Sequence, residues 1–495
     1  MADHKYGVVY TPSTVAAKTL TPSNDALLDE FGINFIRITW VDWINNVRYR
    51  VVPRPYFSKL LHSARPGISL TKACFGLVFL ALAPGFSGIG EYQYVLDLST
   101  FRLCPYAPGH ASILGFFQEK LPTPQFGLAV PFCPRSILKR ITDDAKATAD
   151  VSFLVGFESE FILLSATSPK LVTVNNADWS VSSKLPSGSV ESTVLQEIAE
   201  CLEAAGIELQ MYHAEAAPGQ AIVTGPLTPL EAADALVHTR ETIYNVASKH
   251  GLRATFAPRL YSNSCGSGAH AHISVHKRGD LKTGADAHLA PTLSRSERSF
   301  LQGVLAHVPA LCALTLPTTF SYARVLDGIW SGGTYAAWGS ENREAAVRLC
   351  GTEGQHHFEV RFIDGTANPH LVLAGLVGAG AHAVKERALL TSGDCAAKPV
   401  AQMAEEEREA LGVQAVGRLP ASIEQARKNL GADKELTAVL GEEFVARYLG
   451  TNAVSLSSAL ISFCQLTRGH KTQTLETLLK AETEDETVTK LVQFY

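Results

Sequence analysis

Short apolar runs broken by glycine and proline dominate the first part of the chain. They include Phe31–Val41 and Val47–Val52, which have strand length and are bounded by turn residues. This pattern predicts a small β-rich domain over residues 25–134, with one or two helices. Residues 1–24 are polar and contain two prolines, which indicates an N-terminal arm.

After residue 134 the pattern alternates between strand and helix signals. Apolar residues recur at helical spacing in Glu191–Ala205, and an extended segment follows at Ile207–Tyr212. The clearest helix is Thr228–His250, which opens with a capping residue, a proline and a capping-box glutamate. The chain from about residue 394 is predicted to be mostly helical. We therefore predict a second domain over residues 135–495.

Polar side chains two positions apart recur in strand-like segments of this second domain. Because strand side chains alternate between the two faces of a sheet, residues two apart project side by side. The pairs are Glu158 with Glu160, His270 with His272, and Glu359 with Arg361. Two further polar clusters are Glu215–Gln220 and Asn342–Arg348.

These charges predict a ligand site. Burying so many of them without partners would cost several kcal/mol each, so they must face one another or bound ions. Carboxylates and imidazoles bind divalent metals, whereas arginines bind phosphate or carboxylate with two parallel hydrogen bonds.

The overall composition favours a globular protein that acts on small ligands. The chain has 495 residues, 46% hydrophobic and 18% charged, enough for two or more domains. The formal charge of −5 and the dispersed basic residues argue against nucleic-acid or membrane partners. Nine scattered cysteines without a C-x-x-C pair favour a reducing, cytoplasmic location. The N-terminus lacks the apolar core of a signal peptide, and the longest apolar stretch is interrupted by glycine and proline.

Five motifs, in this order along the chain, resemble those of the glutamine synthetase family. They are G-F-E-S-E-F (156–161), E-A-A-P-G-Q (215–220), G-S-G-A-H-A-H-I-S (266–274), E-N-R-E-A-A-V-R (341–348) and F-E-V-R-F-I-D-G-T-A-N-P (358–369). The similarity covers roughly residues 90–390. The chain most resembles the glutamine-synthetase-like branch that includes fungal FluG-type proteins and bacterial γ-glutamyl-polyamine ligases.

The resemblance implies an α+β protein. It implies a small β-grasp N-terminal domain and a catalytic domain whose curved antiparallel sheet, flanked by helices, forms a two-ended funnel. ATP would enter one mouth and the amino acid the other. It also implies a ring-shaped homo-oligomer in which a neighbour's N-terminal domain completes each site.

The resemblance further assigns residues to two metal sites for Mg²⁺ or Mn²⁺. Glu158, His270 and Glu359 match ligands of the metal that bridges the ATP phosphates. Glu160 and Glu215 match ligands of the second metal, which orders the amino-acid substrate.

Other residues match contacts of the substrates. Arg324 and Arg361 match the arginines that hold the carboxylate of the acid substrate. Gly266 and Trp330 match other positions at the acid-substrate site. The matches to the nucleotide and the transferring phosphoryl group are His272, Ser274, Arg343 and Arg348. Glu91 aligns with an aspartate that helps to bind and deprotonate ammonium.

The sequence departs from the family pattern at two positions. Ile222 stands where the family has a third carboxylate ligand of the second metal, and isoleucine cannot coordinate a cation. Trp330 stands where glutamine-forming enzymes have a glutamate that shields the acyl phosphate. An indole there favours an organic amine over ammonia, because it adds apolar surface and removes a charge.

Some of these residues also have simpler interpretations. Arg343 and Arg348 would form structural ion pairs with Glu341 or Glu344, and Trp330 would be a packed core aromatic. The pattern G-A-G-A-H-A at 378–383 resembles a dinucleotide loop but fits a small-residue packing helix better, since no acidic residue follows about twenty positions later. Catalysis by Cys265, which lies near the predicted site, has no support beyond proximity.

Three functions are consistent with these residues. The first is an ATP- and Mg²⁺-dependent ligase that joins the side-chain carboxylate of glutamate, or a related acid, to an amine other than ammonia. The second is a glutamine-synthetase-like pseudoenzyme with a regulatory or assembly role, which the departures at Ile222 and Trp330 favour. The third is a metal-dependent hydrolase that activates water.

Overall fold

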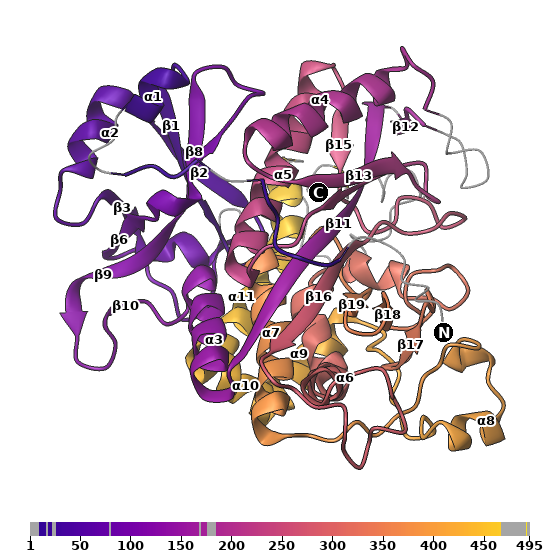
Figure 1. Cartoon of the computed structure of the whole chain (residues 1–495). Coiled ribbons are helices and arrows are strands. Elements are labelled where there is room, and N and C mark those ends of the chain that lie inside the picture. Colours follow the sequence, from indigo (N-terminus) through magenta and orange to yellow (C-terminus); the bar gives the residue numbers. More distant parts are fainter. Residues whose placement is uncertain are drawn as a thin grey trace.

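Two four-stranded sheets form the N-terminal part of the computed structural model, which describes residues 9–15, 18–21, 26–78, 81–167, 170–175, 185–466 and 492. Their strand orders are β2-β1-β8-β7 and β10-β9-β6-β3 (Figure 1). The strands are β1 (Phe35–Val41), β2 (Val47–Pro53), β3 (Gly67–Thr71), β6 (Glu91–Leu96), β7 (Arg102–Leu103), β8 (His110–Ile113), β9 (Gly115–Thr123) and β10 (Gly127–Ala129). Also in this part are α1 (Ala26–Glu30), α2 (Arg54–Leu61) and the short hairpin β4 (Leu77–Val78) and β5 (Ala81–Leu82). The predicted β-rich N-terminal segment is thus confirmed, and its first two apolar runs form β1 and β2.

A nine-stranded sheet dominates the rest of the chain. Its main path runs β13-β14-β11-β16-β19-β18-β17, and β12 and β15 pair with β11. All the pairings are antiparallel except that of β17 with β18. The strands are β11 (Val151–Ala166), β12 (Val172–Thr173), β13 (Leu209–Ala214), β14 (Gln220–Thr224), β15 (Arg253–Thr255), β16 (Ala269–Lys277), β17 (Trp338–Ser340), β18 (Val347–Cys350) and β19 (His357–Val360). The fold is therefore α+β, as the resemblance implied.

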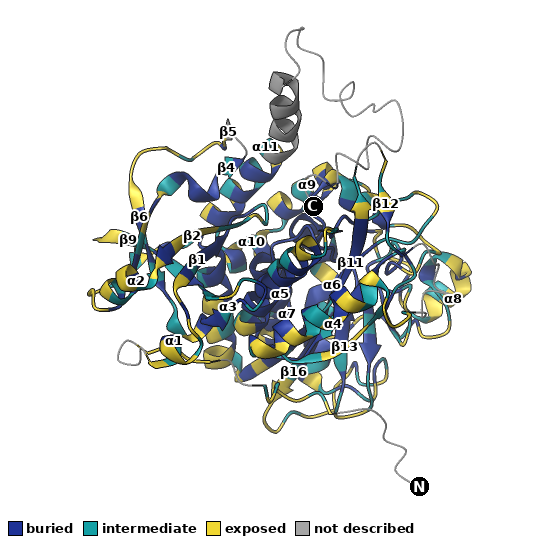
Figure 2. Ribbon diagram, turned by 90° about the horizontal axis from the view of Figure 1, so that it is seen from above, coloured by how far each residue is buried: buried dark blue, intermediate teal, exposed yellow. Residues whose placement is uncertain are grey.

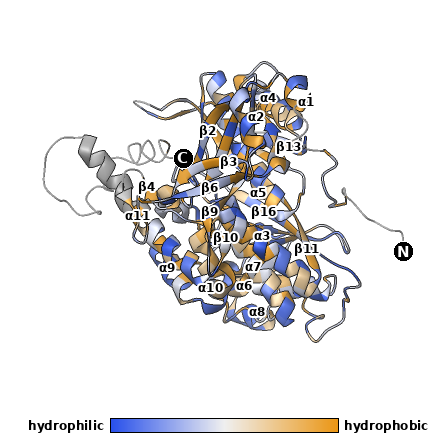
Figure 3. Ribbon diagram, turned by 90° about the vertical axis from the view of Figure 1, so that its left-hand side faces the viewer, coloured by the Kyte–Doolittle hydropathy of each residue, from blue (hydrophilic) through white to orange (hydrophobic). Residues whose placement is uncertain are grey.

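Helices flank this sheet and pack with it around the main apolar core. They are α3 (Pro134–Ala149), α4 (Val190–Ala204), α5 (Pro229–Lys249), α6 (Arg295–Thr315), α7 (Pro369–Glu386), α8 (Glu405–Ala410), α9 (Ile423–Ala432), α10 (Lys434–Leu440) and α11 (Glu442–Leu466). Figure 2 shows α5 and α7 as largely buried helices, whereas α8 lies at the surface. The hydropathy view in Figure 3 shows the same helices around the sheet, with hydrophilic residues on α8 and α9.

The predicted helices follow the sequence signals closely. The run Glu191–Ala205 forms α4, and Thr228–His250 forms α5, where Glu231 accepts hydrogen bonds from the backbone N–H and hydroxyl of Thr228. The expected extended segment forms β13. The C-terminal helical prediction is confirmed by α8 to α11, and its continuation over residues 467–491 lies outside the described residues.

The glycine-rich segment 378–383 belongs to the buried helix α7. A Cβ added to Gly380 would lie 2.1 Å from the Phe300 ring of α6, so this position needs glycine for close helix packing. The small-residue packing interpretation is therefore confirmed.

A buried arginine connects the two parts of the chain. Arg135, at the start of α3, donates to the Gly115 carbonyl and to Asp97 in the N-terminal part. It also forms a double hydrogen bond with Asp234 of α5, whose carboxylate lies 2.7 Å from His370 Nε2. This network fixes the N-terminal sheets against the helices under the large sheet. Among the described residues, no helix is long and apolar enough to cross a membrane.

Candidate active site

The register of the large sheet arranges the polar side chains in rows. Directly paired residues of antiparallel strands project from the same face. One row runs Gly156, His272, Glu359 and Arg348, from β11 through β16 and β19 to β18. The adjacent row holds Val223, Glu158 and His270, and the next holds His213, Ala221 and Glu160. The period-two pairs expected for β11 and β16 thus lie on one face, beside each other.

This face forms the floor of a cleft of about 1040 Å³. Almost every site residue expected from the sequence lines it: Glu158, Glu160, Glu215, Gly266, His270, His272, Arg324, Trp330, Arg343, Arg348, Glu359 and Arg361. The exceptions are Ser274 and Glu91. Ser274 lies further along β16, where its Oγ is 2.7 Å from His276 Nε2, and Glu91 pairs with Lys120 on the N-terminal sheet. The structure thus brings together residues from five separate motifs, while the roles assigned to them stay predictions.

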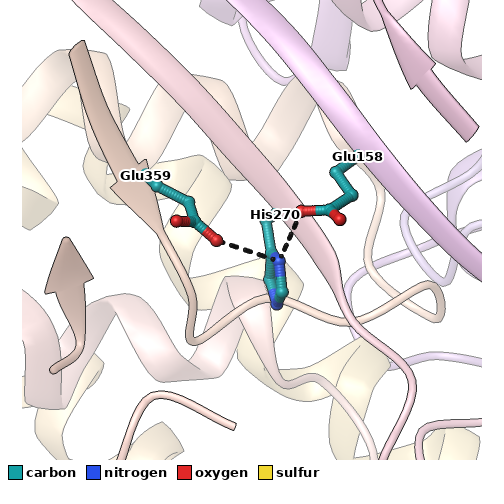
Figure 4. A group of neighbouring side chains, drawn as sticks. All are labelled: Glu158, His270 and Glu359. Carbon is teal, nitrogen blue, oxygen red and sulfur yellow. Dashed lines mark hydrogen bonds and ion pairs between the residues drawn. The ribbon is translucent and has the colours of Figure 1, made fainter. Parts of the chain in front are cut away.

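The first ligand group consists of Glu158, His270 and Glu359. His270 Nδ1 lies 3.0 Å from Glu158 Oε2 and 3.3 Å from Glu359 Oε1, so both carboxylates converge on one ring nitrogen (Figure 4). One ligand atom from each of the three residues lies within 4.8 Å of the others. This spacing and donor chemistry fit a divalent cation.

Electrostatics in this group favour ionised carboxylates. Burial opposes ionisation of Glu158, but hydrogen bonds with His270 and His272 hold its pKa well below the usual range. Burial also opposes ionisation of Glu359, but the charge of Arg361 and the contacts with His270 and His272 together hold the pKa of that carboxyl well below its usual range. Burial disfavours a charged His270, yet hydrogen bonds with the two carboxylates raise its pKa. The group therefore keeps negative charge available for a cation.

Glu160 is held by the glycine-rich turn before β16. Its Oε2 accepts a hydrogen bond of 2.9 Å from the Gly268 backbone N–H. A Cβ on Gly268 would lie 2.5 Å from His270 Nε2 and 2.6 Å from Arg324 Nη2, so only glycine fits there. A Cβ on Gly266 would likewise lie 2.6 Å from Arg324 Cγ. The G-S-G motif is thus explained by the close approach of Arg324.

Two arginines line the cleft beside the carboxylate cluster. Arg324 is almost fully buried and donates to the Arg361 carbonyl and toward His270 Nε2, each at 3.0 Å. Arg361 lies just beyond the end of β19, hydrogen-bonded to Glu359 and, at 2.8 Å, to the Trp330 carbonyl. These contacts fix both guanidinium groups against the carboxylate cluster.

The position of Arg348 fits both interpretations from the sequence, a ligand contact in the cleft and a structural ion pair. It lines the cleft and donates 3.0 Å to Glu359, and it also forms an ion pair with Glu341, as the structural interpretation expected. Glu344 instead accepts hydrogen bonds from the backbone N–H groups of Gly328 and Trp330. The Glu341–Arg348 pair lies at the cleft, so it can orient Arg348 toward a ligand.

Trp330 is not a core residue. Its exposed fraction is 53%, and its backbone has a φ of 57°, a left-handed conformation that is uncommon for a bulky residue. The hydrogen bonds from Trp330 N to Glu344 and from Arg361 to the Trp330 carbonyl hold this conformation. The packed-aromatic interpretation was therefore wrong, and the indole stands at the cleft.

Ile222 does not face the cleft. It pairs with Ser159 and not with Glu160, so its side chain projects from the opposite face of the sheet. There it is fully buried in an apolar cluster with Phe161 and Leu163. The expectation that this position leaves a gap in the second metal site therefore does not describe the structure.

Sequence reasoning missed His213, which lies beside Glu215. Its Nδ1 is 3.4 Å from Glu215 Oε1, and Glu158, His213 and Glu215 form a second group with ligand atoms within 4.8 Å of one another. Burial and the nearby charge of Glu160 raise the pKa of Glu215 to about 7. The two-residue spacing of His213 and Glu215 repeats the pattern found on β11 and β16, so the signal was present.

Cys265 borders the cleft as a half-buried thiol. Burial raises its pKa above the usual value, and the charge of Glu160 acts in the same direction. A raised pKa disfavours the reactive thiolate.

Comparison with known proteins places this site in context. Residues 131–459 match the family model of the glutamine synthetase catalytic domain. The chain is 33% identical over 443 residues to Protein fluG of Emericella nidulans, covering 86% of the chain but 48%, about half, of that protein. It is 29% identical over 433 residues to gamma-glutamylpolyamine synthetase GlnA3 of Streptomyces coelicolor, covering 83% and 87%. A crystal structure of a novel glutamine synthase homolog shares the fold, with a TM-score of 0.73, 24% identity and coverage of 94% and 99%.

Proposed function

The chain belongs to the glutamine synthetase family, and on that premise we propose that it is an ATP-dependent ligase that forms an amide between a side-chain carboxylate and an organic amine. The single observation that carries this proposal is the meeting, in one cleft, of a carboxylate–imidazole cluster with four arginines. Phosphoryl transfer needs little covalent help from a protein, but it needs much well-placed positive charge.

Glu158, His270 and Glu359 would hold one cation, and Glu160 and Glu215 border the place of a second. Bound there, Mg²⁺ or Mn²⁺ supplies positive charge that neutralises the phosphate oxygens of ATP. The carboxylate–imidazole donor set and its spacing support this assignment.

The arginines have separate tasks in this proposal. Arg324 and Arg361, fixed by their contacts with His270 and Glu359, hold the carboxylate of the acid substrate. Arg343 and Arg348 neutralise the phosphoryl group in transit. A carboxylate oxygen of the acid attacks the γ-phosphorus of ATP, and ADP leaves. The amine nitrogen then attacks the acyl carbon, and inorganic phosphate leaves as the amide forms.

The choice of amine rests on Trp330. Its exposed indole at the cleft offers apolar surface to the carbon chain of an organic amine, and it provides no charge for ammonium. We propose glutamate, or a related acid, as the acyl donor. We also propose a homo-oligomer with sites shared between subunits, in which Glu91 would serve a neighbouring cleft, since it does not line its own.

The test is ADP release by the purified full-length protein with Mg²⁺, ATP, glutamate and hydroxylamine as a small trapping amine. We expect a hydroxamate product in the wild type that is lost in Glu160→Ala. Glu203→Ala, an exposed glutamate on α4, is the matched control and should behave as the wild type. No product with glutamate or any other tested acid, while ATP binds, would contradict the ligase and favour a regulatory, non-catalytic role.

A further inference from the structure

The row that contains Glu160 also contains a histidine. His213 of β13 and Glu160 of β11 both pair with Ala221 of β14, so their side chains project from the same face on either side of a small residue. Ala221 between them is small and fully buried. Glu215 stands two residues beyond His213, with its Oε1 3.4 Å from His213 Nδ1.

The hydrogen bonding of His213 leaves one ring nitrogen available. Nδ1 lies 3.0 Å from the Ala214 carbonyl oxygen, which can only accept, so Nδ1 carries the proton and Nε2 keeps its lone pair. A backbone carbonyl that holds the second ring nitrogen is a common way to orient a metal-binding histidine. Its side chain is 41% exposed, so the imidazole is reachable from the cleft.

We propose that His213 is a ligand of the second cation, together with Glu215 and the neighbouring carboxylates Glu158 and Glu160. This inference rests on the proposed function and names a ligand set for its second metal. The ligand atoms of Glu158, His213 and Glu215 lie within 4.8 Å of one another, and Glu158 also belongs to the first group. Glu158 would then contribute to both sites, and His213 would supply the second one with a donor that position 222 does not provide.

An imidazole changes the preference of this site. Mg²⁺ strongly prefers oxygen ligands, whereas Mn²⁺ and later transition metals accept imidazole nitrogen. With His213 as a ligand, each of the two groups contains one imidazole, so both sites should accept Mn²⁺ as well as Mg²⁺.

The test is Mn²⁺ binding to the full-length protein without nucleotide, measured by electron paramagnetic resonance of free Mn²⁺. We expect two ions per chain in the wild type and a loss of at least tenfold in affinity for one of them in His213→Ala. His288→Ala is the matched control, because His288 is exposed and its Nδ1 also lies 3.0 Å from a backbone carbonyl, that of Ala285. His213→Glu should restore the second ion and shift its preference toward Mg²⁺.

Unchanged Mn²⁺ stoichiometry and affinity in a folded His213→Ala protein would overturn the assignment. Because this measurement needs neither ATP nor turnover, it separates the two proposals. Two bound ions without any ligase product would contradict the proposed function alone.

A different observation concerns the N-terminal arm. The Tyr10 hydroxyl donates 2.8 Å to the His272 carbonyl, and its ring stacks on His357 at 4.7 Å between centroids with an angle of 16°. Two more contacts hold the arm: Ser13 N–H to the Pro226 carbonyl and Thr14 N–H to Glu208. A Cβ on Gly156 would lie 2.9 Å from the Tyr10 hydroxyl, so β11 leaves room for it.

We infer that Tyr10 covers the end of the cleft at His357, beside His272, which the resemblance assigns to the nucleotide, so that nucleotide binding requires displacement of Tyr10. This inference also rests on the proposed function. A stacked aromatic ring that must leave lowers the apparent affinity for its competitor.

The test is binding of a fluorescent ADP analogue to the full-length protein. Tyr10→Ala should bind it several-fold more tightly than the wild type, while Tyr56→Ala, an exposed control on α2, should not change the affinity. Equal or weaker binding by Tyr10→Ala would overturn the inference. Binding by neither protein would contradict the proposed function and this inference with it.

Discussion

Glu160 is paired across the sheet with Ala221, and the next residue, Ile222, projects from the opposite face into the core. This relationship decides how the departure at position 222 is to be understood. In this register, a carboxylate at position 222 would not reach the cleft, so Ile222 does not remove a metal ligand from it. Instead, His213, which also pairs with Ala221, is a further donor on the cleft face.

A carboxylate at position 222 should therefore harm the fold. Ile222→Glu would bury a carboxylate beside Phe161 and Leu163, and we expect it to lower the free energy of unfolding by about 3 kcal/mol or more. Ile222→Val, the volume control, should cost about 1 kcal/mol. Urea denaturation measures both. Tighter Mg²⁺ binding by Ile222→Glu at unchanged stability would show that position 222 reaches the cleft.

Much of this site could be predicted from the sequence, because strand periodicity fixes which side chains share a face. The pairs on β11 and β16 needed only the alternation of apolar and polar residues, and the helices α4 and α5 carried clear caps. The orientation of Ile222 could not be predicted, since it depends on the register between β14 and β11, which is set by tertiary pairing. The stack of Tyr10 on His357 joins residues far apart in the chain, and no local pattern indicates such a contact.

The glycine before the histidine pair should be essential for activity. Gly268→Ala would place a Cβ 2.5 Å from His270 Nε2 and 2.6 Å from Arg324 Nη2, so both side chains must move. A misplacement of about 1 Å can lower a rate about 100-fold. We therefore expect kcat/KM for hydroxamate formation to fall about 100-fold. Gly417→Ala, where a Cβ would meet nothing within 4 Å, is the control. Equal activities of the two variants would argue against the assigned positions of His270 and Arg324.

Trp330 should set the preference for the amine. Trp330→Ala removes apolar surface at the cleft, so kcat/KM should fall by about tenfold for an alkyl amine and much less for hydroxylamine. Leu326→Ala, another exposed apolar residue nearby in sequence that does not line the cleft, should leave the ratio unchanged. A uniform loss for both amines would mean that Trp330 supports the loop without contacting the amine.

The Arg135–Asp234 network should govern stability and its dependence on acid. Although burial acts against ionisation, Arg135 and His370 lower the pKa of Asp234 from 3.8 to about 2. Because the folded-state pKa is the lower one, this stabilisation is present above about pH 4 and is lost as the pH falls toward 2. Asp234→Asn should cost about 3 kcal/mol at pH 7, because the buried Arg135 keeps only Asp97 as a charged partner, and less at pH 3.

Urea denaturation at the two pH values measures this effect. Asp144→Asn, an exposed aspartate on α3, should change the unfolding midpoint little at either pH. A cost for Asp234→Asn that is equal at both pH values would show that the carboxylate charge is not what stabilises the junction between the two parts of the chain.

The most direct test of the central claim follows an oxygen atom. Glutamate labelled with ¹⁸O in its side-chain carboxylate is supplied with ATP, Mn²⁺ or Mg²⁺ and an amine, and the inorganic phosphate is analysed by mass spectrometry. Attack of the carboxylate on the γ-phosphorus predicts one ¹⁸O in each phosphate that the wild type releases. The Glu160→Ala protein should release no ¹⁸O-labelled phosphate. Phosphate that forms without ¹⁸O would mean that water attacks ATP, and it would contradict an acyl-phosphate ligase.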